Sequence, residues 1–430
     1  MVAGTVLVAT VTAGCTAGGS APLPSSRALS SADAAETLPE PDVASPVVAH
    51  VAEGVRPPTN RWYSGLAFGE EATTAFGSPL AVSAREGGLV VGVPRVTATA
   101  DEVVAQTGAT LQMHAEGAVG RPLVTRADPV AVGLTAQGPD GGDLVEFALA
   151  EGWPAVGLTA RAEVGVVLSA APEPVEAGVW SISVGETQMA LTIDGGAVEG
   201  SVVRLDEGGT AVVTAVPEGG SLARTASAVG APVGTVDIAM ELGDRVGTTL
   251  GFAPEPTLLA VPEERADRLD CDLGTYESVT GTLLACRAAS MTWEVPAVDT
   301  GRSLDLSRAT DGQRDAIRAA LVEEAEVSAQ PPGDTYFGAK ALYRLAMLAD
   351  LAHQLEEPAL QERFTDQLGD ALTAWTDPDA CETRDERCFE YDPVLGGVVG
   401  RAAAFGSEEF NDHHFHYGYF LWAAATAVRL

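Results

Sequence analysis

The period of the hydrophobic residues changes once along this chain, near residue 309, and that change limits the folds open to it. Between residues 48 and 253, short runs rich in Val, Thr and Ile alternate with turns that contain Gly, Asp or Pro. One hairpin is predicted here, from Trp180–Val184 through Gly185–Thr187 to Gln188–Ile193. No segment of helical period is apparent between these runs. The pattern therefore favours an antiparallel β-sandwich over a parallel α/β fold.

Beyond residue 309, apolar residues recur every three or four positions, which predicts amphipathic helices. Thr310 or Asp311 can cap the first of them. The predicted helices run through residues 313–321, 337–355, 364–375 and 412–428. The expected fold class is therefore multidomain β + α. It comprises a β-sandwich at residues 48–253, a small mixed linker domain at 254–308 and a helical domain at 309–430, which is short for a complete helical domain.

The first residues are typical of an exported protein. Val6–Val11 is apolar, and Thr12-Ala13-Gly14-Cys15 resembles a bacterial lipobox, in which the Cys is lipidated after cleavage. Residues 16–47 are rich in Ser, Ala, Pro and Gly, which predicts a disordered tether. We therefore expect an extracellular or cell-surface protein, with lipidation of Cys15 as the possible anchor.

The charge of the chain limits its partners. The formal net charge is −35, which argues against nucleic acid and against an anionic membrane surface as binding partners. Most of the carboxylates are expected to lie at the surface and keep the protein soluble. A neutral or cationic ligand remains compatible with this charge, and we expect a monomer.

Four cysteines form two close pairs in the sequence, Cys271 with Cys286 and Cys381 with Cys388. In an exported chain each pair can close into a local disulfide. The alternative is a zinc site built from all four, but the spacings lack the C-x2-C pattern that such sites usually show.

Residues 410–420 combine groups that suit proton chemistry. Three of the six histidines of the chain fall here, next to one Asp, one Asn and two Tyr. On a helix, Asp412 and His416 would share a face, and His416 or Asn411 could hold the carboxyl group. A partly buried carboxyl group with a raised pKa can donate a proton to a leaving group. Tyr417 and Tyr419 offer apolar faces and polar rims, which suit sugars.

Each of these residues also has a plainer interpretation. His413 and His414 can be satisfied core residues, and Phe415, Phe420 and Trp422 are expected in the core. Asp412 with His416 could instead be half of a metal site that the neighbouring glutamates complete, and a hydrolase with a metal on the three histidines is a weaker hypothesis.

The segment Asn411-Asp412-His413-His414-Phe415-His416-Tyr417-Gly418-Tyr419-Phe420 resembles the signature of the glycoside hydrolase family 81 endo-β-1,3-glucanases. Three other segments resemble family motifs in the same order: Pro58–Tyr63, Asp334–Lys340 with the single Lys of the chain, and Phe389–Asp392 followed by Gly396–Val399. Leu395 stands where the family has Trp, which puts one sugar contact in doubt.

The resemblance implies a β-sandwich, a small linker domain and the first helices of an incomplete (α/α)6 barrel. It also implies hydrolysis of internal β-1,3-glucosidic bonds with inversion, without metal or cofactor. Asp412 would be the general acid and His416 an active-site support. The residues and the resemblance together give the following candidates for substrate binding: Asn411, His413, Tyr417, Tyr419, Tyr391, Asp392, Asp334 and Lys340.

The general base of the family is a Glu on a later segment. We therefore expect this chain to be an N-terminal fragment that lacks the base and is inactive by itself. The alternative function is a non-catalytic cell-surface β-glucan-binding protein.

Overall fold

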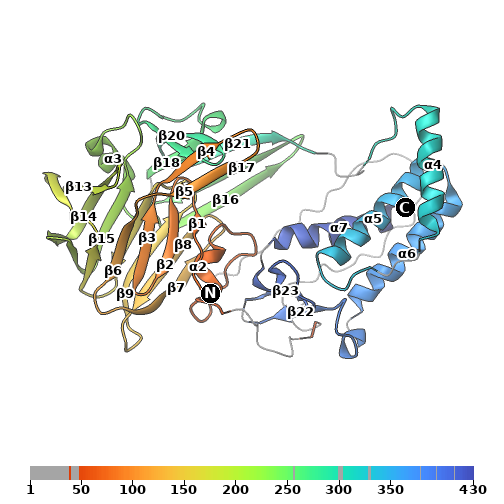
Figure 1. The fold of residues 1–430 in the computed structure, drawn as a ribbon, viewed down its shortest axis with the longest axis horizontal. Helices are drawn as coiled ribbons and strands as arrows, with labels where there is room; N and C mark the ends of the chain where they lie inside the picture. The colour runs from red at the N-terminus through yellow and green to blue at the C-terminus, as the bar shows by residue number, and fades with distance from the viewer. Residues whose placement is uncertain are drawn as a thin grey trace.

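The computed structural model describes residues 38–39, 48–254, 257–298, 304–327, 331–377, 379–393, 395–410 and 412–430. The predicted signal and lipobox segment at residues 1–15 lies outside the described residues. So do Asn411 and all of the predicted tether except two residues. The described residues form a sheet-rich part and a helical part, which Figure 1 shows on the left and on the right.

The sheet-rich part is built on one antiparallel sheet of thirteen strands among the described residues. Its strands are β1 (Ala75–Phe76), β2 (Ala81–Arg85), β3 (Gly88–Gly92), β6 (Leu111–Ala115), β7 (Val119–Ala127), β8 (Ala131–Gln137), β9 (Asp143–Ala150), β10 (Ala155–Ala160), β11 (Val164–Leu168), β12 (Glu173–Glu176), β13 (Val179–Val184), β14 (Thr187–Glu199) and β15 (Val202–Ala215). The predicted hairpin is confirmed, because β13 pairs with β14 from Val184 opposite Thr187.

Strand β15 joins the two halves of this sheet. One edge of β15 pairs with β14, while the other pairs first with β11 and then with β10. The halves β1-β2-β3-β6-β11 and β10-β9-β8-β7 therefore diverge from a common strand. They meet again at the far side, where the Gly87 N–H donates to the Gly120 carbonyl over 2.6 Å. The structure thus shows one curled sheet in the region where the sequence predicts a β-sandwich.

Two glycines make the bend of β14 and β15 possible. The register between these strands shifts between Asp194 and Gly196, which marks a β-bulge. A Cβ atom on Gly209 would lie 2.1 Å from the Gly195 carbonyl oxygen, and Gly195 has φ +71°. Because only glycine fits both positions, the bulge and the curl of the sheet depend on this pair.

The core lies between the two halves of the curled sheet. Trp153, Phe147 and Tyr63 are among its largest fully buried side chains. Burial alternates along β6, where Leu111, Met113 and Ala115 face the core and the residues between them face solvent. This alternation is the period-two pattern that predicted β-structure from the sequence.

Smaller elements surround the main sheet. They are the helices α2 (Ser64–Ala67) and α3 (Leu222–Val229), the sheet of β16 (Thr235–Leu242), β17 (Arg245–Ala253) and β21 (Ser290–Pro296), the sheet of β18 (Thr257–Pro262), β19 (Thr275–Ser278) and β20 (Gly281–Ala288), the hairpin of β4 (Pro94–Ala98) and β5 (Val103–Thr107), and the short turn η1 (Glu263–Arg265). Strand β17 pairs with β21, so one sheet spans the predicted boundary at residue 253.

The expectation that no helix interrupts the β-region is wrong. Helix α3 lies between β15 and β16, and the Ser221 side chain caps it by accepting from the Arg224 N–H over 3.4 Å. Leu222 and Ala226 bury one face of α3 against Ala190. A helix of two turns gives too few repeats for its period to be recognised in the sequence.

The helical part consists of α4 (Asp311–Ala325), α5 (Phe337–Gln354), α6 (Pro358–Thr376) and α7 (His413–Arg429), with the short turns η2 (Asp379–Glu382) and η3 (Ser407–Glu409) and the hairpin β22 (Phe389–Asp392) and β23 (Gly397–Gly400). Thr310 caps α4 through a capping box with Gln313, as the sequence predicts. Leu342 of α5, Leu368 of α6 and Phe420 of α7 share one core. None of the helices in the described ranges is long and apolar enough to cross a membrane.

Candidate active site

Asp412 stands immediately before α7, not within it. Helix α7 begins at His413, and Asp412 is its N-cap residue in the left-handed conformation with φ 51°. The Asp412 carbonyl accepts from the N–H groups of Phe415 and His416 over 2.9 and 3.0 Å. The expectation that Asp412 and His416 share a helix face is therefore wrong, because the chain leaves helical geometry at Asp412. The Asp412 residue is also exposed, so partial burial of its carboxyl group is not observed.

The His416 ring is buried between α5 and α7. Its residue is 1% exposed, and its Nδ1 lies 3.0 Å from the Thr335 hydroxyl oxygen. Its Nε2 is buried and has no hydrogen-bond partner within the described residues. Burial lowers the pKa of His416, although the carboxylates of Asp412 and Asp334 act to raise it. Burial therefore favours the neutral form of the His416 imidazole.

The start of α5 lies against this imidazole. The Asp334 carboxylate accepts from the N–H groups of Tyr336 and Phe337 over 2.8 and 2.7 Å, so it caps the first turn. The Tyr336 ring lies 5.3 Å from the His416 ring, and the Lys340 ammonium group lies 5.0 Å from the Tyr336 ring centre. The structure thus places the predicted residue Asp334 near His416, whereas Lys340 is placed against the Tyr336 ring.

The motif at Pro58–Tyr63 lies at the other side of the α7 N-terminus. The Thr59 hydroxyl is 3.4 Å from His414 Nε2. The Arg61 guanidinium donates to the carbonyls of Glu409 and Pro58, and burial lowers the pKa of Arg61 to about 10. The sheet-rich part therefore fixes the turn that carries Asp412. The sequence motif was recognised, but this role for Arg61 was not predicted.

The His413 and Tyr417 side chains pack against each other, and neither is free to line an open cleft. Their rings stack with centroids 4.2 Å apart, and the Tyr417 hydroxyl donates to the Val398 carbonyl over 3.0 Å. Burial, assisted by nearby cationic and imidazole groups, lowers the pKa of His413 to about 4, and burial also raises the pKa of Tyr417. Tyr419 packs beside Tyr343 and Phe415.

The three histidines of the signature segment point to different neighbours. His413 stacks on Tyr417, His414 approaches Thr59 and His416 contacts Thr335. No cluster of three or more potential metal-ligating residues occurs in the part of the chain that the structure describes. These placements give the hypothesis of a metal on the three histidines no support.

The hairpin of β22 and β23 carries two further predicted residues below the surface. Tyr391 is 9% exposed and Asp392 is 4% exposed. The Asp392 carboxylate accepts from the Leu395 N–H over 3.0 Å, which shapes the turn of the hairpin. Leu395 itself is buried in the core of the sheet-rich part. These residues therefore shape the loop beside the signature segment and are not open to a polymeric ligand in this arrangement.

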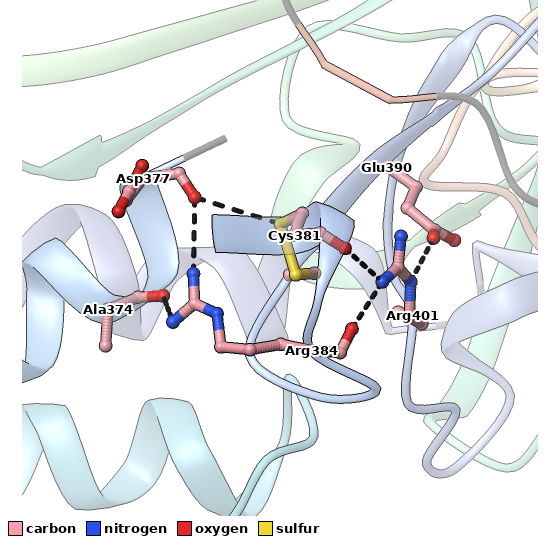
Figure 2. The surroundings of a disulfide bond; sticks show 7 residues. Ala374, Asp377, Cys381, Arg384, Glu390 and Arg401 are labelled. Atoms are coloured by element: carbon pink, nitrogen blue, oxygen red, sulfur yellow. Dashed lines mark hydrogen bonds and ion pairs between the residues drawn. A yellow bond between two sulfur atoms is a disulfide. The ribbon is translucent and has the colours of Figure 1, made fainter. Parts of the chain in front are cut away.

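A disulfide and an arginine hold the base of this hairpin. Cys381 and Cys388 form a disulfide, and Cys271 pairs with Cys286 elsewhere in the chain. Figure 2 shows how Arg401 lies beside the first of these bonds. Its Nη1 donates to the Cys381 carbonyl over 2.6 Å, and its Nε donates to the Glu390 carboxylate. All four sulfur atoms are in disulfides, so they are not zinc ligands in this structure.

The disulfide loop is also tied to the end of α6. Arg384 donates to the carbonyls of Ala374 and Asp377 over 2.6 and 3.2 Å (Figure 2). Arg401 donates to the Arg384 carbonyl as well. Because Arg401 follows β23 and Glu390 belongs to β22, these contacts join α6 to the hairpin that borders the signature segment.

Three exposed phenylalanines near Asp412 were not predicted as site residues. Phe337 is 48% exposed, Phe405 is 63% exposed and Phe415 is 53% exposed. Phe415 was expected in the core, and that expectation is wrong because it lies on the solvent side of the first turn of α7. Phe420 meets the expectation and is buried. The sequence alone gave no signal for this exposure, since Phe337 and Phe415 lie within predicted amphipathic helices and Phe405 lies in a loop.

Comparison with known proteins agrees with the motifs. Residues 308–430 match the model of the glycosyl hydrolase family 81 C-terminal domain. That segment is therefore similar to the C-terminal domain of glycoside hydrolase family 81. It includes α4 to α7 and the whole signature segment, so the relationship expected from the motifs is confirmed.

Two relatives of known activity are similar to parts of the chain. A glucan endo-1,3-β-D-glucosidase from Thermobifida fusca is 35% identical over 160 residues, which are 36% of this chain and 20% of that protein. One from Acetivibrio thermocellus is 29% identical over 198 residues, 44% of this chain and 24% of that protein. The aligned regions thus span about a fifth to a quarter of the length of these relatives.

A solved structure shares the fold of nearly the whole chain. A family 81 glycoside hydrolase from Clostridium thermocellum, solved as a mutant, superposes with a TM-score of 0.74 at 19% identity and covers 91% of this chain and 58% of its own. The sheet-rich part and the helical part therefore both occur together in a family 81 protein.

Proposed function

We propose that this protein hydrolyses internal β-1,3-glucosidic bonds of β-glucans with inversion. The observation that carries the proposal is the exposed Asp412 carboxylate above a buried, neutral His416, within a segment that matches family 81. Two relatives with this similarity are named glucan endo-1,3-β-D-glucosidases. An exposed carboxyl group at the start of a helix can reach a glycosidic oxygen of a bound polymer.

In this proposal Asp412 protonates the leaving oxygen as general acid. His416 acts as a positioning residue, because its ring is fixed by Thr335 and its Nε2 has no hydrogen-bond partner in the part of the chain that the structure describes. Inversion also needs a carboxylate that activates water on the opposite face of the bond. We assign no residue to that role.

The finer architecture forms part of the proposal. We propose that the curled sheet corresponds to a β-sandwich domain, followed by a small linker domain, and that α4 to α7 belong to an (α/α)6 barrel. The likeness to the Clostridium thermocellum structure supports this assignment, since it extends over both parts of the chain.

We propose further that the protein works as an exported monomer, with lipidation at Cys15 as its attachment. The two disulfides support export, because such bonds persist mainly in oxidising compartments. Labelling with a radioactive fatty acid, compared between the wild type and Cys15→Ala, tests the attachment.

The proposed reaction is tested by the release of reducing sugar from laminarin and curdlan by the protein expressed from its native gene. Wild type should release oligosaccharides, and Asp412→Asn should lower kcat by at least about 100-fold, the lower end of what general acid catalysis supplies. Asn tolerates the left-handed backbone at this position, so the variant should fold. Undiminished hydrolysis by Asp412→Asn would remove Asp412 from the acid role.

A further inference from the structure

Four aromatic rings gather at the surface beside Asp412, and the residues assigned above do not include them. Tyr336 lies at the centre. Its ring centroid is 4.9 Å from that of Phe337, 4.7 Å from that of Phe405 and 6.1 Å from that of Phe415, which it faces in a stacked arrangement. These four residues, the aromatic platform, come from the start of α5, the loop after β23 and the first turn of α7.

The platform is exposed although it is aromatic. The three phenylalanines are each about half exposed, whereas the chain has only 6% aromatic residues and buries Phe364, Phe410 and Phe420. Clusters of exposed apolar side chains commonly mark a binding surface. The Tyr336 ring lies within 6.1 Å of the rings of Phe337, Phe405, Phe415 and His416, so these aromatic groups form one cluster.

The backbone around the platform is strained. Phe405 has φ 52°, Phe410 has φ 56° and Asp412 has φ 51°, all in the left-handed region. For residues other than Gly, Asn and Asp, this region costs about 1–2 kcal/mol per residue. Strain of this kind concentrates at functional sites, where the surrounding fold holds a side chain in a required place. Here it holds Phe405 out in solvent, against the Tyr336 ring.

The charges around the platform restrict its ligand. Asp334 and Asp412 flank it, and both act electrostatically on His416 beneath it. These carboxylates repel phosphates and acidic chains. Lys340 lies over the Tyr336 ring, so that site for a cation is already occupied. A neutral ligand with flat apolar faces and a polar rim fits best. The faces of glucopyranose carry C–H groups, which complement the negative faces of aromatic rings.

We propose that Phe405, Phe337 and Phe415, arranged around Tyr336, form a stacking platform that binds glucopyranose rings of β-1,3-glucan beside Asp412. This inference rests on the proposed function and adds a binding surface to it. It also reassigns the sugar-stacking role from Tyr417, whose ring is stacked on His413 and whose hydroxyl is engaged by Val398.

The test is calorimetric titration with laminarihexaose, with all variants made in an Asp412→Asn background so that the ligand is not hydrolysed. Phe405→Ala should raise the Kd about tenfold, which corresponds to about 1.4 kcal/mol. Phe405→Tyr keeps the ring and should stay within about twofold of the background Kd. The matched control is Phe76→Ala, a phenylalanine that is 44% exposed on β1 of the sheet-rich part, and it should leave the Kd unchanged.

The outcomes separate this inference from the proposed function. If the background protein binds laminarihexaose and Phe405→Ala and Phe337→Ala bind it equally well, the platform is overturned while hydrolysis at Asp412 can still stand. If the variants change the sedimentation coefficient but not the Kd, the platform is instead a contact between copies of the chain. If the background protein fails to bind and the wild type fails to hydrolyse β-1,3-glucan, both proposals are wrong.

Circular dichroism shows whether each variant is folded. If Phe405→Ala is not folded, Phe337→Ala replaces it in the titration.

Discussion

At the scale of single residues, the first turn of α7 keeps two imidazoles neutral for the same physical reason. Burial removes water from His413 and His416, and an imidazolium ion loses more from that removal than a neutral ring does. The two rings then serve differently. His413 is stacked on Tyr417, whereas Nε2 of His416, which the carboxylates of Asp412 and Asp334 influence, has no hydrogen-bond partner among the described residues.

This neutrality predicts a pH-dependent stability. The pKa of His413 falls from 6.5 to about 4 on folding, so between these pH values the unfolded chain binds more protons than the folded one. The free energy of unfolding is therefore unaffected by the titration of His413 above pH 6.5, and it decreases as the pH falls from 6.5 toward 4. The melting temperature should therefore drop across this window, and His413→Gln should flatten the drop. His414→Gln, which keeps the buried ring, should not. An unchanged slope in His413→Gln would contradict this account.

Thr335 offers a second test at this scale. Its side chain is fully buried and its hydroxyl lies 3.0 Å from His416 Nδ1. Thr335→Val keeps the shape but leaves a buried ring nitrogen unpaired, at a cost of about 1–3 kcal/mol. It should also lower glucan hydrolysis, because the ring loses its orientation. Thr335→Ser keeps the hydroxyl and should retain most activity. Urea unfolding and reducing-sugar release measure both effects, and equal behaviour of Val and Ser would show that the hydrogen bond has no such role.

At the scale of elements, the hairpin of β22 and β23 depends on one arginine. Arg401 joins Glu390 of β22 to the carbonyls of the disulfide loop, which Arg384 ties to α6 (Figure 2). The Glu390 side chain is 7% exposed and that of Arg401 is 21% exposed, so the pair is largely desolvated. Removing one partner of a buried pair leaves an uncompensated charge.

Arg401→Met should therefore lower the free energy of unfolding by about 3–5 kcal/mol. Arg401→Lys should restore little, because one ammonium group cannot reproduce the fixed fork of donors that reaches three oxygen atoms. The matched control is Arg363→Met, whose pair with Glu326 is solvent-exposed, and its loss should cost under about 1 kcal/mol. Denaturant unfolding compares the three variants. Equal losses for Arg401→Met and Arg363→Met would mean that the hairpin is held by other contacts.

At the scale of the whole molecule, the sequence predicted what depends on local pattern. The Thr310 cap and the period of α4 to α6 are encoded within a few residues. The predicted helices lie where the observed ones do, although α4 and α6 extend beyond the predicted ranges. The motif around Asp412 could also be recognised in the sequence. The curl of the sheet could not be predicted, because it depends on the close approach of Gly195 and Gly209 across two strands. The left-handed turn at Asp412 and the exposure of Phe405 were also not predictable, since contacts from α5 and from the Pro58–Tyr63 motif set them.

The central claim, that Asp412 protonates the leaving group, is tested most directly by comparing two substrates of the native-gene product. Laminarin has a poor leaving group that needs a proton, whereas a dinitrophenyl β-laminarioside has one that does not. The account predicts that Asp412→Asn lowers kcat/KM on laminarin by at least about 100-fold and changes kcat/KM on the dinitrophenyl substrate little. Equal losses on both substrates would contradict the acid role, because they would show that Asp412 serves binding or folding instead.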